Sequence, residues 1–169
     1  DRTGWGNYIV SRWFDQWASR VMLPAHIFEG WTGICQTYLQ VSKKRGARTL
    51  LGLGSAHPRT VIELMNIEHR RWGLAPLRET PFTRQIEQEL ALADRVIIQS
   101  RFSERTLIEH GVSADKLVRI PLGVDVQHFC PAPSQLSHPF RVLFIGQVML
   151  RKGVQYLLEA WKLLGWHDA

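Results

Sequence analysis

The sequence predicts an α/β fold, in which helices and strands alternate along the whole chain. Short runs of β-branched and other apolar residues recur, and segments with apolar residues at helical spacing separate them. The sequence contains no internal repeat. It also contains no apolar run of the roughly 18–20 residues that a membrane helix needs. Such a pattern is typical of a parallel sheet covered by helices.

The first expected helix carries a single apolar stripe. Its members stand at positions i, i+3, i+4 and i+7, so they share one face of a helix: Val10, Trp13, Phe14 and Trp17. We expect this stripe to pack in the core, because core packing explains such a stripe more simply than an aromatic binding site does.

A short strand over residues 25–28 is expected next, with Glu29 at its end. The helix after it should begin near Thr32, whose hydroxyl is a candidate cap, and Gly46 should end it in the left-handed conformation.

The residue pattern in the middle of the chain predicts three more strands, each followed or preceded by a helix. Glu87 and Glu89 should face water on the helix over residues 82–93, while Ser103 should cap a short helix that Gly111 ends. The expected strands cover residues 49–54, 95–100 and 116–121.

A final strand and helix follow a segment rich in proline and serine. Residues 140–146 read as a strong buried strand, and the helix after it carries the clearest apolar stripe of the chain. The intervening residues 131–139 have no periodicity and are expected to form a linker.

The net charge of the chain indicates the kind of partner it binds, and its cysteine content indicates its cellular compartment. A net charge of +6 favours anionic partners, which include nucleic acid, nucleotide phosphates and an anionic membrane surface. Two cysteines, Cys35 and Cys130, form no C-x-x-C pair and no disulfide framework. We therefore expect a reducing compartment, the cytoplasm, and the charge permits peripheral attachment to the inner face of a membrane.

The loop from Gly146 to Gly153 joins the last strand to the last helix. Ligands of open α/β sheets sit at the carboxyl ends of strands, and a helix N-terminus there presents free N–H groups to phosphate. Arg151 and Lys152 add cationic donors. The loop contains neither G-x-G-x-x-G nor a P-loop, so the alternative is a solvated turn with two surface cations.

His57 is a second candidate, since it follows a strand that ends in small residues and precedes a helix. The alternative is a structural histidine. The nearby Glu63, Glu68 and His69 lack H-E-x-x-H spacing, and neighbours on a helix face different sides, so no metal site is expected.

A nucleic-acid-binding alternative rests on residues 106–116, which look like the turn of a helix-turn-helix. The second element should then be a helix. Residues 117–121 instead favour a strand because they are β-branched and end in proline, and we therefore expect no nucleic-acid partner.

Four pieces of the sequence, in order, resemble a run shared by family 4 glycosyltransferases. The first two are Ala93-Asp94-Arg95-Val96-Ile97-Ile98-Gln99-Ser100 with Gly111-Val112, and Ile120-Pro121-Leu122-Gly123-Val124-Asp125 with Phe129 and Pro131. The last two are Val142-Leu143-Phe144-Ile145-Gly146, and Arg151-Lys152-Gly153 with Leu157-Leu158-Glu159-Ala160.

This resemblance implies a GT-B fold, in which two Rossmann-like domains face each other across a cleft, and both would be incomplete in this chain. Residues 1–130 would form the later part of the acceptor domain, 131–139 the linker, and 140–169 the first βα unit of the donor domain. After Lys152, where the resemblance would place the family's E-x7-E element, that spacing does not occur. We therefore expect an internal fragment that is inactive by itself.

The resemblance also implies the reaction, the transfer of a hexosyl unit from a nucleotide sugar to an acceptor with retention and without a metal or other cofactor. Lys152 matches the diphosphate-binding lysine and Gly146 the loop glycine, while Gln147 stands where arginine is common and Arg151 is its candidate replacement. His57 and Glu29 are the candidate catalytic residues on the acceptor side. A lipid, a polysaccharide or a small molecule is open as acceptor, and a non-catalytic sugar-phosphate binder is the further alternative.

Overall fold

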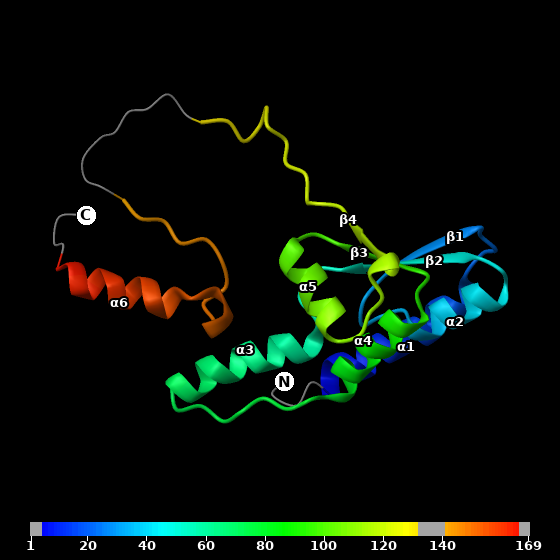
Figure 1. Ribbon diagram of the computed structural model, residues 1–169, viewed down its shortest axis with the longest axis horizontal. Helices are drawn as coiled ribbons and strands as arrows, with labels where there is room; N and C mark the ends of the chain where they lie inside the picture. Colours follow the sequence, from blue (N-terminus) through cyan, green and yellow to red (C-terminus); the bar gives the residue numbers. More distant parts are fainter. Residues whose placement is uncertain (1–4, 132–140, 166–169) are drawn as a thin grey trace.

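The computed structural model describes residues 5–131 and 141–165. It contains a four-stranded sheet in the order β1-β2-β3-β4, and every neighbouring pair is parallel (Figure 1). The α/β prediction is confirmed. The strands are β1 (Ile27–Trp31), β2 (Arg48–Leu53), β3 (Arg95–Ile98) and β4 (Leu117–Arg119).

Six α-helices and two 3₁₀ helices are present among the described residues. Most of these α-helices were predicted from the sequence, and their observed boundaries differ from the predicted ones by a few residues. They are α1 (Trp5–Val21), α2 (Gln36–Lys44), α3 (Pro58–Arg71), α4 (Pro81–Leu92), α5 (Arg101–Glu109) and α6 (Val154–Leu164), with η1 (Ala114–Lys116) and η2 (Leu150–Lys152).

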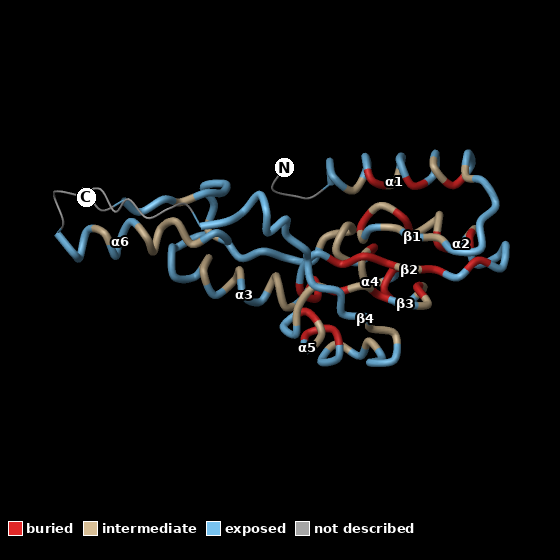
Figure 2. Tube along the Cα trace, turned by 90° about the horizontal axis from the view of Figure 1, so that it is seen from above, coloured by how far each residue is buried: buried red, intermediate tan, exposed pale blue. Residues whose placement is uncertain are grey.

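The core lies on one face of the sheet, between the strands and helices α2, α4 and α5. Figure 2 shows that buried positions concentrate along β2 and β3. Alternate residues of these strands point into the core, as the pleat requires. The core residues are Cys35, Leu39, Leu51, Leu53, Leu90, Ala93, Val96, Ile98 and Leu107. The opposite face is open at β1, where Ile27, Glu29 and Trp31 are exposed.

The expected orientation of α1 is wrong. The stripe of Val10, Trp13, Phe14 and Trp17 is exposed, and α1 packs on α2 and α4 through Ser11, Asp15 and Ser19 instead.

Asp15 explains this reversal, because its carboxylate receives the backbone N–H groups of Thr37 at 2.7 Å and Tyr38 at 2.9 Å. These groups belong to the first turn of α2, where N–H groups lack intrahelical partners and the helix dipole favours a negative charge. A buried carboxylate is tolerated when it is paired in this way.

A second buried carboxylate holds the loop before α2. Glu89 of α4 accepts hydrogen bonds from the backbone N–H groups of Gly33 and, at 3.0 Å, Cys35. The expectation that Glu89 faces water is therefore wrong. So is the expected cap from Thr32, because Cys35 occupies the N-cap position and its side chain makes no capping bond.

The short helix α5 begins earlier than expected. Ser100, not Ser103, is its N-cap, and the Ser100 hydroxyl accepts the N–H of Ser103 at 3.1 Å. Gly46 follows α2 with φ +81°, so its predicted left-handed conformation is confirmed. Gly111 was predicted to end α5, which it does, and it is also left-handed with φ +84°.

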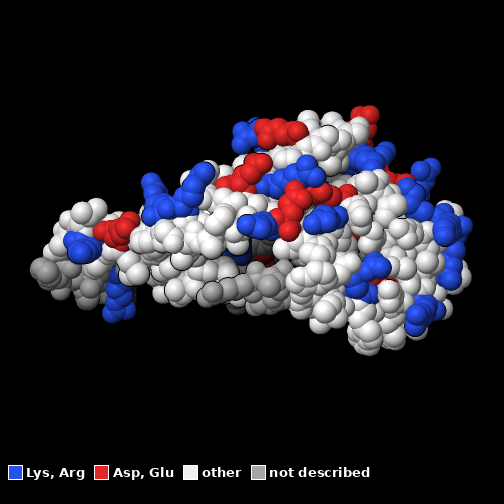
Figure 3. All heavy atoms as spheres, turned by 90° about the horizontal axis from the view of Figure 1, so that it is seen from below, with Lys and Arg blue, Asp and Glu red and all other residues white. Residues whose placement is uncertain are grey.

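The segment after Gly111 forms η1 and then β4, which pairs in parallel with β3. A helix-turn-helix would need a recognition helix at this place, and the strand prediction is confirmed instead. Basic side chains also lie among acidic ones over the middle of the face that Figure 3 shows, rather than in one continuous stripe.

Residues 141–146 do not form the expected strand, and Val142, Leu143 and Ile145 are exposed. A parallel strand needs a neighbour that accepts and donates its backbone hydrogen bonds, and no described strand lies beside this segment. Phe140, which the prediction included, and most of the expected linker lie outside the described residues. The described residues thus contain one sheet, and the two-domain GT-B arrangement stays a prediction.

Candidate functional site

The loop from Gly146 to Gly153 is shaped by two glycines with positive φ. Gly146 has φ +154° and Gly153 has φ +72°, a left-handed value that disfavours side chains with a Cβ atom. Between them the single turn η2 places Arg151 and Lys152 immediately before α6. The loop therefore ends in two cations followed directly by a helix N-terminus.

No side chain caps the N-terminus of α6, for which Gly153 is the N-cap residue. Arg151 and Lys152 are exposed, and neither side chain makes a hydrogen bond or ion pair with any described residue. Gln147 is likewise exposed. A helix N-terminus with free N–H groups and adjacent cations is suited to binding phosphate oxygens.

Helix α3 lies against η2, and a polar contact joins α3 to the first turn of α6. The Tyr156 hydroxyl donates to the carboxylate of Glu68 and accepts from the Arg71 guanidinium at 2.6 Å. Arg71 and Tyr156 also line a hollow of about 360 Å³ with Trp72 and Glu159.

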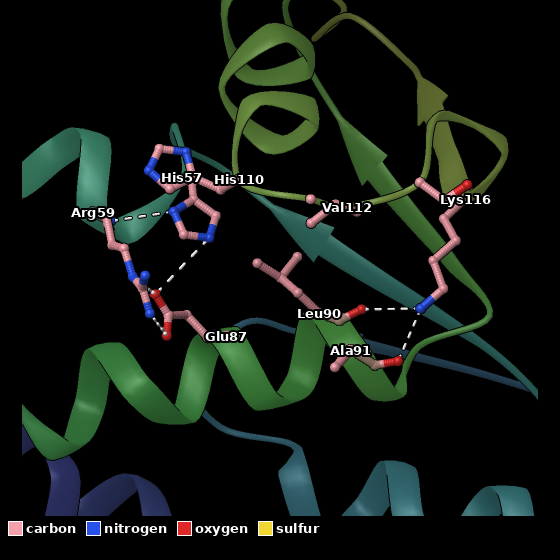
Figure 4. A pocket seen from close by; sticks show the side chains of 10 residues that line it. His57, Arg59, Glu87, Leu90, Ala91, His110, Val112 and Lys116 are labelled. Atoms are coloured by element: carbon pink, nitrogen blue, oxygen red, sulfur yellow. Dashed lines mark hydrogen bonds and ion pairs between the residues drawn. The ribbon is translucent and has the colours of Figure 1, made fainter.

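His57 lies at the start of α3, where it acts as the N-cap. Its Nδ1 accepts the backbone N–H of Arg59 at 3.3 Å, and Pro58 occupies the first turn, where its missing N–H costs nothing. The imidazole is buried and stacks on His110, with ring centroids 4.1 Å apart and planes within 12° (Figure 4).

Burial lowers the pKa of His57 from 6.5 to about 4, and the nearby charge of His110 acts in the same direction. The ring is therefore neutral at pH 7. Because Nδ1 accepts a hydrogen bond, the proton resides on Nε2, which lies 4.0 Å from Oε1 of Glu87.

A hollow of about 450 Å³ adjoins this pair of histidines and is lined by residues of α3, α4 and the segment after α5. Its charged groups are already paired, as Figure 4 shows. The Arg59 guanidinium binds Glu87 at 2.7 Å, and the Lys116 ammonium donates to the carbonyl of Ala91 at 2.9 Å.

The structure does not gather the predicted residues into one cluster. The expectation that Glu29 ends a strand is wrong, because β1 (Ile27–Trp31) continues past it. Glu29 lies on the open face of β1, whereas His57 is enclosed among the helices that cover the other face. The loop with Lys152 meets α3 near Glu68, and 11 residues of helix from His57 to Glu68 span about 16 Å.

The sequence did not predict that Tyr156, His110 and Lys116 lie next to these sites. Each meets its partner through a contact between distant segments, such as the 88 residues that separate Tyr156 from Glu68. The one available signal was the i, i+3 spacing of Glu68 and Arg71, which places both on one face of α3.

Within residues 5–131 and 141–165, no group of three His, Cys, Asp or Glu side chains is placed to hold a metal ion. None of the helices described there combines the length and apolar character needed to span a membrane.

Comparison with known proteins identifies the family. The sequence model of glycosyltransferase family 4 matches residues 44–128, half of the chain, from the end of α2 to the segment after β4. Neither the curated proteins nor the solved structures contain a match to the chain. The matched region holds β2, β3 and β4 in one parallel sheet, as a Rossmann-like glycosyltransferase domain requires. The chain therefore belongs to glycosyltransferase family 4, which gives glycosyl transfer as its general activity.

Proposed function

We propose that this chain contributes to the transfer of a hexosyl unit from a nucleotide sugar to an acceptor, with retention of anomeric configuration, in a GT-B arrangement. The single observation that carries the proposal is the start of α6. There an uncapped helix N-terminus follows directly on Lys152, whose ammonium has no partner among the described residues.

We call Lys152 and the uncapped N-terminus of α6 the phosphate cradle. The chemistry of the leaving group explains why such a cradle is needed. A nucleoside diphosphate gains negative charge as the glycosidic bond breaks, and preorganised cations and N–H dipoles stabilise that charge. Lys152 and the first N–H groups of α6 would hold the diphosphate, with Arg151 as a second cation. Gly146 and Gln147 would shape the loop that admits it. Because these groups supply the positive charge, we propose that no metal is required.

The acceptor side is assigned to His57 and Glu29. Neutral at pH 7, the His57 imidazole can donate a hydrogen bond from Nε2, because its Nδ1 already accepts the N–H of Arg59. Glu29 is exposed and makes no hydrogen bond with any described residue. A lipid, a polysaccharide and a small molecule all carry the hydroxyl group that would accept the sugar.

We also place the protein in the cytoplasm, with peripheral contact to the inner face of a membrane. Helix α1 supports this contact, because it exposes Trp5, Trp13 and Trp17, and tryptophan favours the interface between water and lipid. Lys and Arg predominate at the right-hand end of Figure 3, where α2 ends, and would attract anionic lipid. Sedimentation with phosphatidylglycerol vesicles tests this part, and binding that survives Trp13→Ala/Trp17→Ala would contradict it.

Pyrophosphate binding tests the main proposal, because pyrophosphate is the part that all nucleoside diphosphates share. Lys152→Ala should weaken binding, measured by calorimetry, by about tenfold to a hundredfold, as expected for a lost hydrogen bond to a charged group. The matched control is Lys162→Ala, in the last turn of the same helix, which should change the affinity by less than about twofold. Equal effects of the two substitutions would refute the cradle.

A further inference from the structure

The contact between α3 and α6 suggests a role for three residues outside the phosphate cradle. Glu68 and Arg71 project from one face of α3, and Tyr156 from the first turn of α6. The Tyr156 hydroxyl donates to Glu68 and accepts from Arg71, and the Arg71 guanidinium also lies 5.5 Å from the centre of the tyrosine ring.

Tyr156 is well placed to control the shape of the cradle. Its backbone N–H donates to the carbonyl of Gly153 at 3.0 Å, so it belongs to the turn whose N–H groups would face phosphate. Its ring lies beside Gly153, where an added Cβ would meet Cδ2 at 3.8 Å. Fixing the hydroxyl therefore fixes the orientation of the turn that follows Lys152.

Helix α3 provides a firm base for this contact. Its N-terminus is anchored next to the sheet, because the His57 backbone N–H donates to the buried Thr106 hydroxyl at 3.1 Å and the His57 ring caps the helix. The C-terminal part of the same helix carries Glu68 and Arg71 and lies against η2. A rigid helix thus connects the parallel sheet to the loop.

We propose that Tyr156 is a positioning residue that, through Glu68 and Arg71, holds the N-terminus of α6 and the Lys152 loop in the orientation that binds diphosphate. This inference rests on the proposed function of the loop. A turn that is already held in its binding orientation loses less conformational freedom when the ligand arrives, and affinity rises accordingly.

Substitution of Tyr156 by Phe tests the proposal, because it removes the hydroxyl and keeps the ring. Pyrophosphate affinity of the 169-residue chain should fall about fivefold to tenfold, the change expected when a hydrogen bond is lost. Tyr8→Phe is the matched control, since Tyr8 lies on α1 and its ring contacts Trp5. The control should change affinity by less than about twofold.

A double-substitution cycle separates positioning from a general effect on folding. Glu68→Ala should weaken binding to a similar extent, and Tyr156→Phe/Glu68→Ala should be no weaker than either single variant, because all three break the same contact. Additive losses would overturn the proposal. Glu68→Ala also keeps the test usable if Tyr156→Phe fails to fold.

A paramagnetic label measures the position of α6 directly. A nitroxide on Arg70→Cys, in a Cys130→Ser background, should broaden the amide signals of the first turn of α6. Tyr156→Phe should reduce that broadening. Unchanged broadening together with unchanged pyrophosphate affinity would overturn the inference.

The two proposals can fail separately. If Lys152→Ala weakens pyrophosphate binding while Tyr156→Phe leaves it unchanged, the positioning role is wrong and the cradle stands. If Lys152→Ala has no effect, the cradle itself is wrong.

Discussion

Substitution of Asp94 by Asn should destabilise the fold at neutral pH and leave it nearly unchanged in strong acid. Asp94 immediately precedes β3, and its Oδ2 receives both the N–H and the hydroxyl of Thr49 at 2.9 Å. Its Oδ1 receives the ammonium of Lys43 at 2.8 Å. One carboxylate thus joins α2, β2 and the start of β3.

The size of the effect follows from the pKa of Asp94. Burial acts to raise this pKa, but the hydrogen bonds from Lys43 and Thr49 and the charge of Lys43 outweigh it and lower the pKa from 3.8 to about 2. At 1.36 kcal/mol for each pKa unit, this would correspond to about 2.4 kcal/mol. The side chain is 25% exposed, and solvent screening reduces the expected value to about 1–2 kcal/mol.

Urea unfolding at several pH values provides the assay. The group has a lowered pKa in the folded state, so its stabilisation is complete above the unfolded pKa of 3.8 and disappears as the pH falls through about 2. The difference in unfolding free energy between the unsubstituted chain and Asp94→Asn should shrink over this range. Asp115→Asn, at an exposed position of η1, is the control and should change stability by less than about 0.5 kcal/mol. A loss that is the same at neutral pH and at about pH 2 would refute the electrostatic reasoning.

Three further predictions concern packing, protonation and metal dependence. Gly52→Ala should lower the free energy of unfolding by about 1–3 kcal/mol and shift the tryptophan fluorescence, because the new Cβ would lie 2.4 Å from Cε3 of Trp31. The control Gly123→Ala should change neither quantity, because no atom would lie within 4 Å of its new Cβ. Because the pKa of His57 is lowered from 6.5 to about 4, its contribution to stability is complete above pH 6.5 and is lost as the pH falls through about 4. The urea midpoint of the unsubstituted chain should therefore fall between pH 6.5 and about pH 4, and His57→Gln should make this fall smaller. An equal fall in both proteins would contradict the lowered pKa of His57. Pyrophosphate affinity should be the same with and without excess EDTA, and a loss in EDTA would show that a metal contributes.

Strands β2, β3 and β4 were predictable because they lie in short runs rich in apolar residues, a composition typical of buried parallel strands. The first strand was placed less accurately, since β1 contains Glu29 and begins two residues later than expected. Leu51, Leu53, Val96 and Ile98 point into the core as the alternation of a pleated strand requires. The left-handed conformation of Gly46 and the helix end at Gly111 were also predictable, since glycine is favoured just after the C-cap residue of a helix.

Periodicity failed for α1 and for Glu89, and both failures have one cause. The loop and first turn of α2 need acceptors for their free N–H groups, and two buried carboxylates from distant segments supply them, Asp15 and Glu89. The fold therefore turns the polar face of α1 inward. No local pattern reveals such a need, because the partners lie 22 to 56 residues apart in the sequence.

The residues that resemble family 4 motifs divide into two groups when their contacts are compared. Asp94 is bound by Lys43 and Thr49, Ser100 caps α5, and Gly111 ends the same helix, so the fold by itself accounts for these three. Lys152 differs, since nothing in the described residues binds its ammonium group and it stands beside an uncapped helix N-terminus. A motif residue whose contacts are satisfied by the fold gives little information about a ligand, whereas an unpaired cation at a helix N-terminus is chemically suited to an anion. This contrast is why the assignment of the diphosphate site rests on Lys152 rather than on the longer stretch of resemblance around β3.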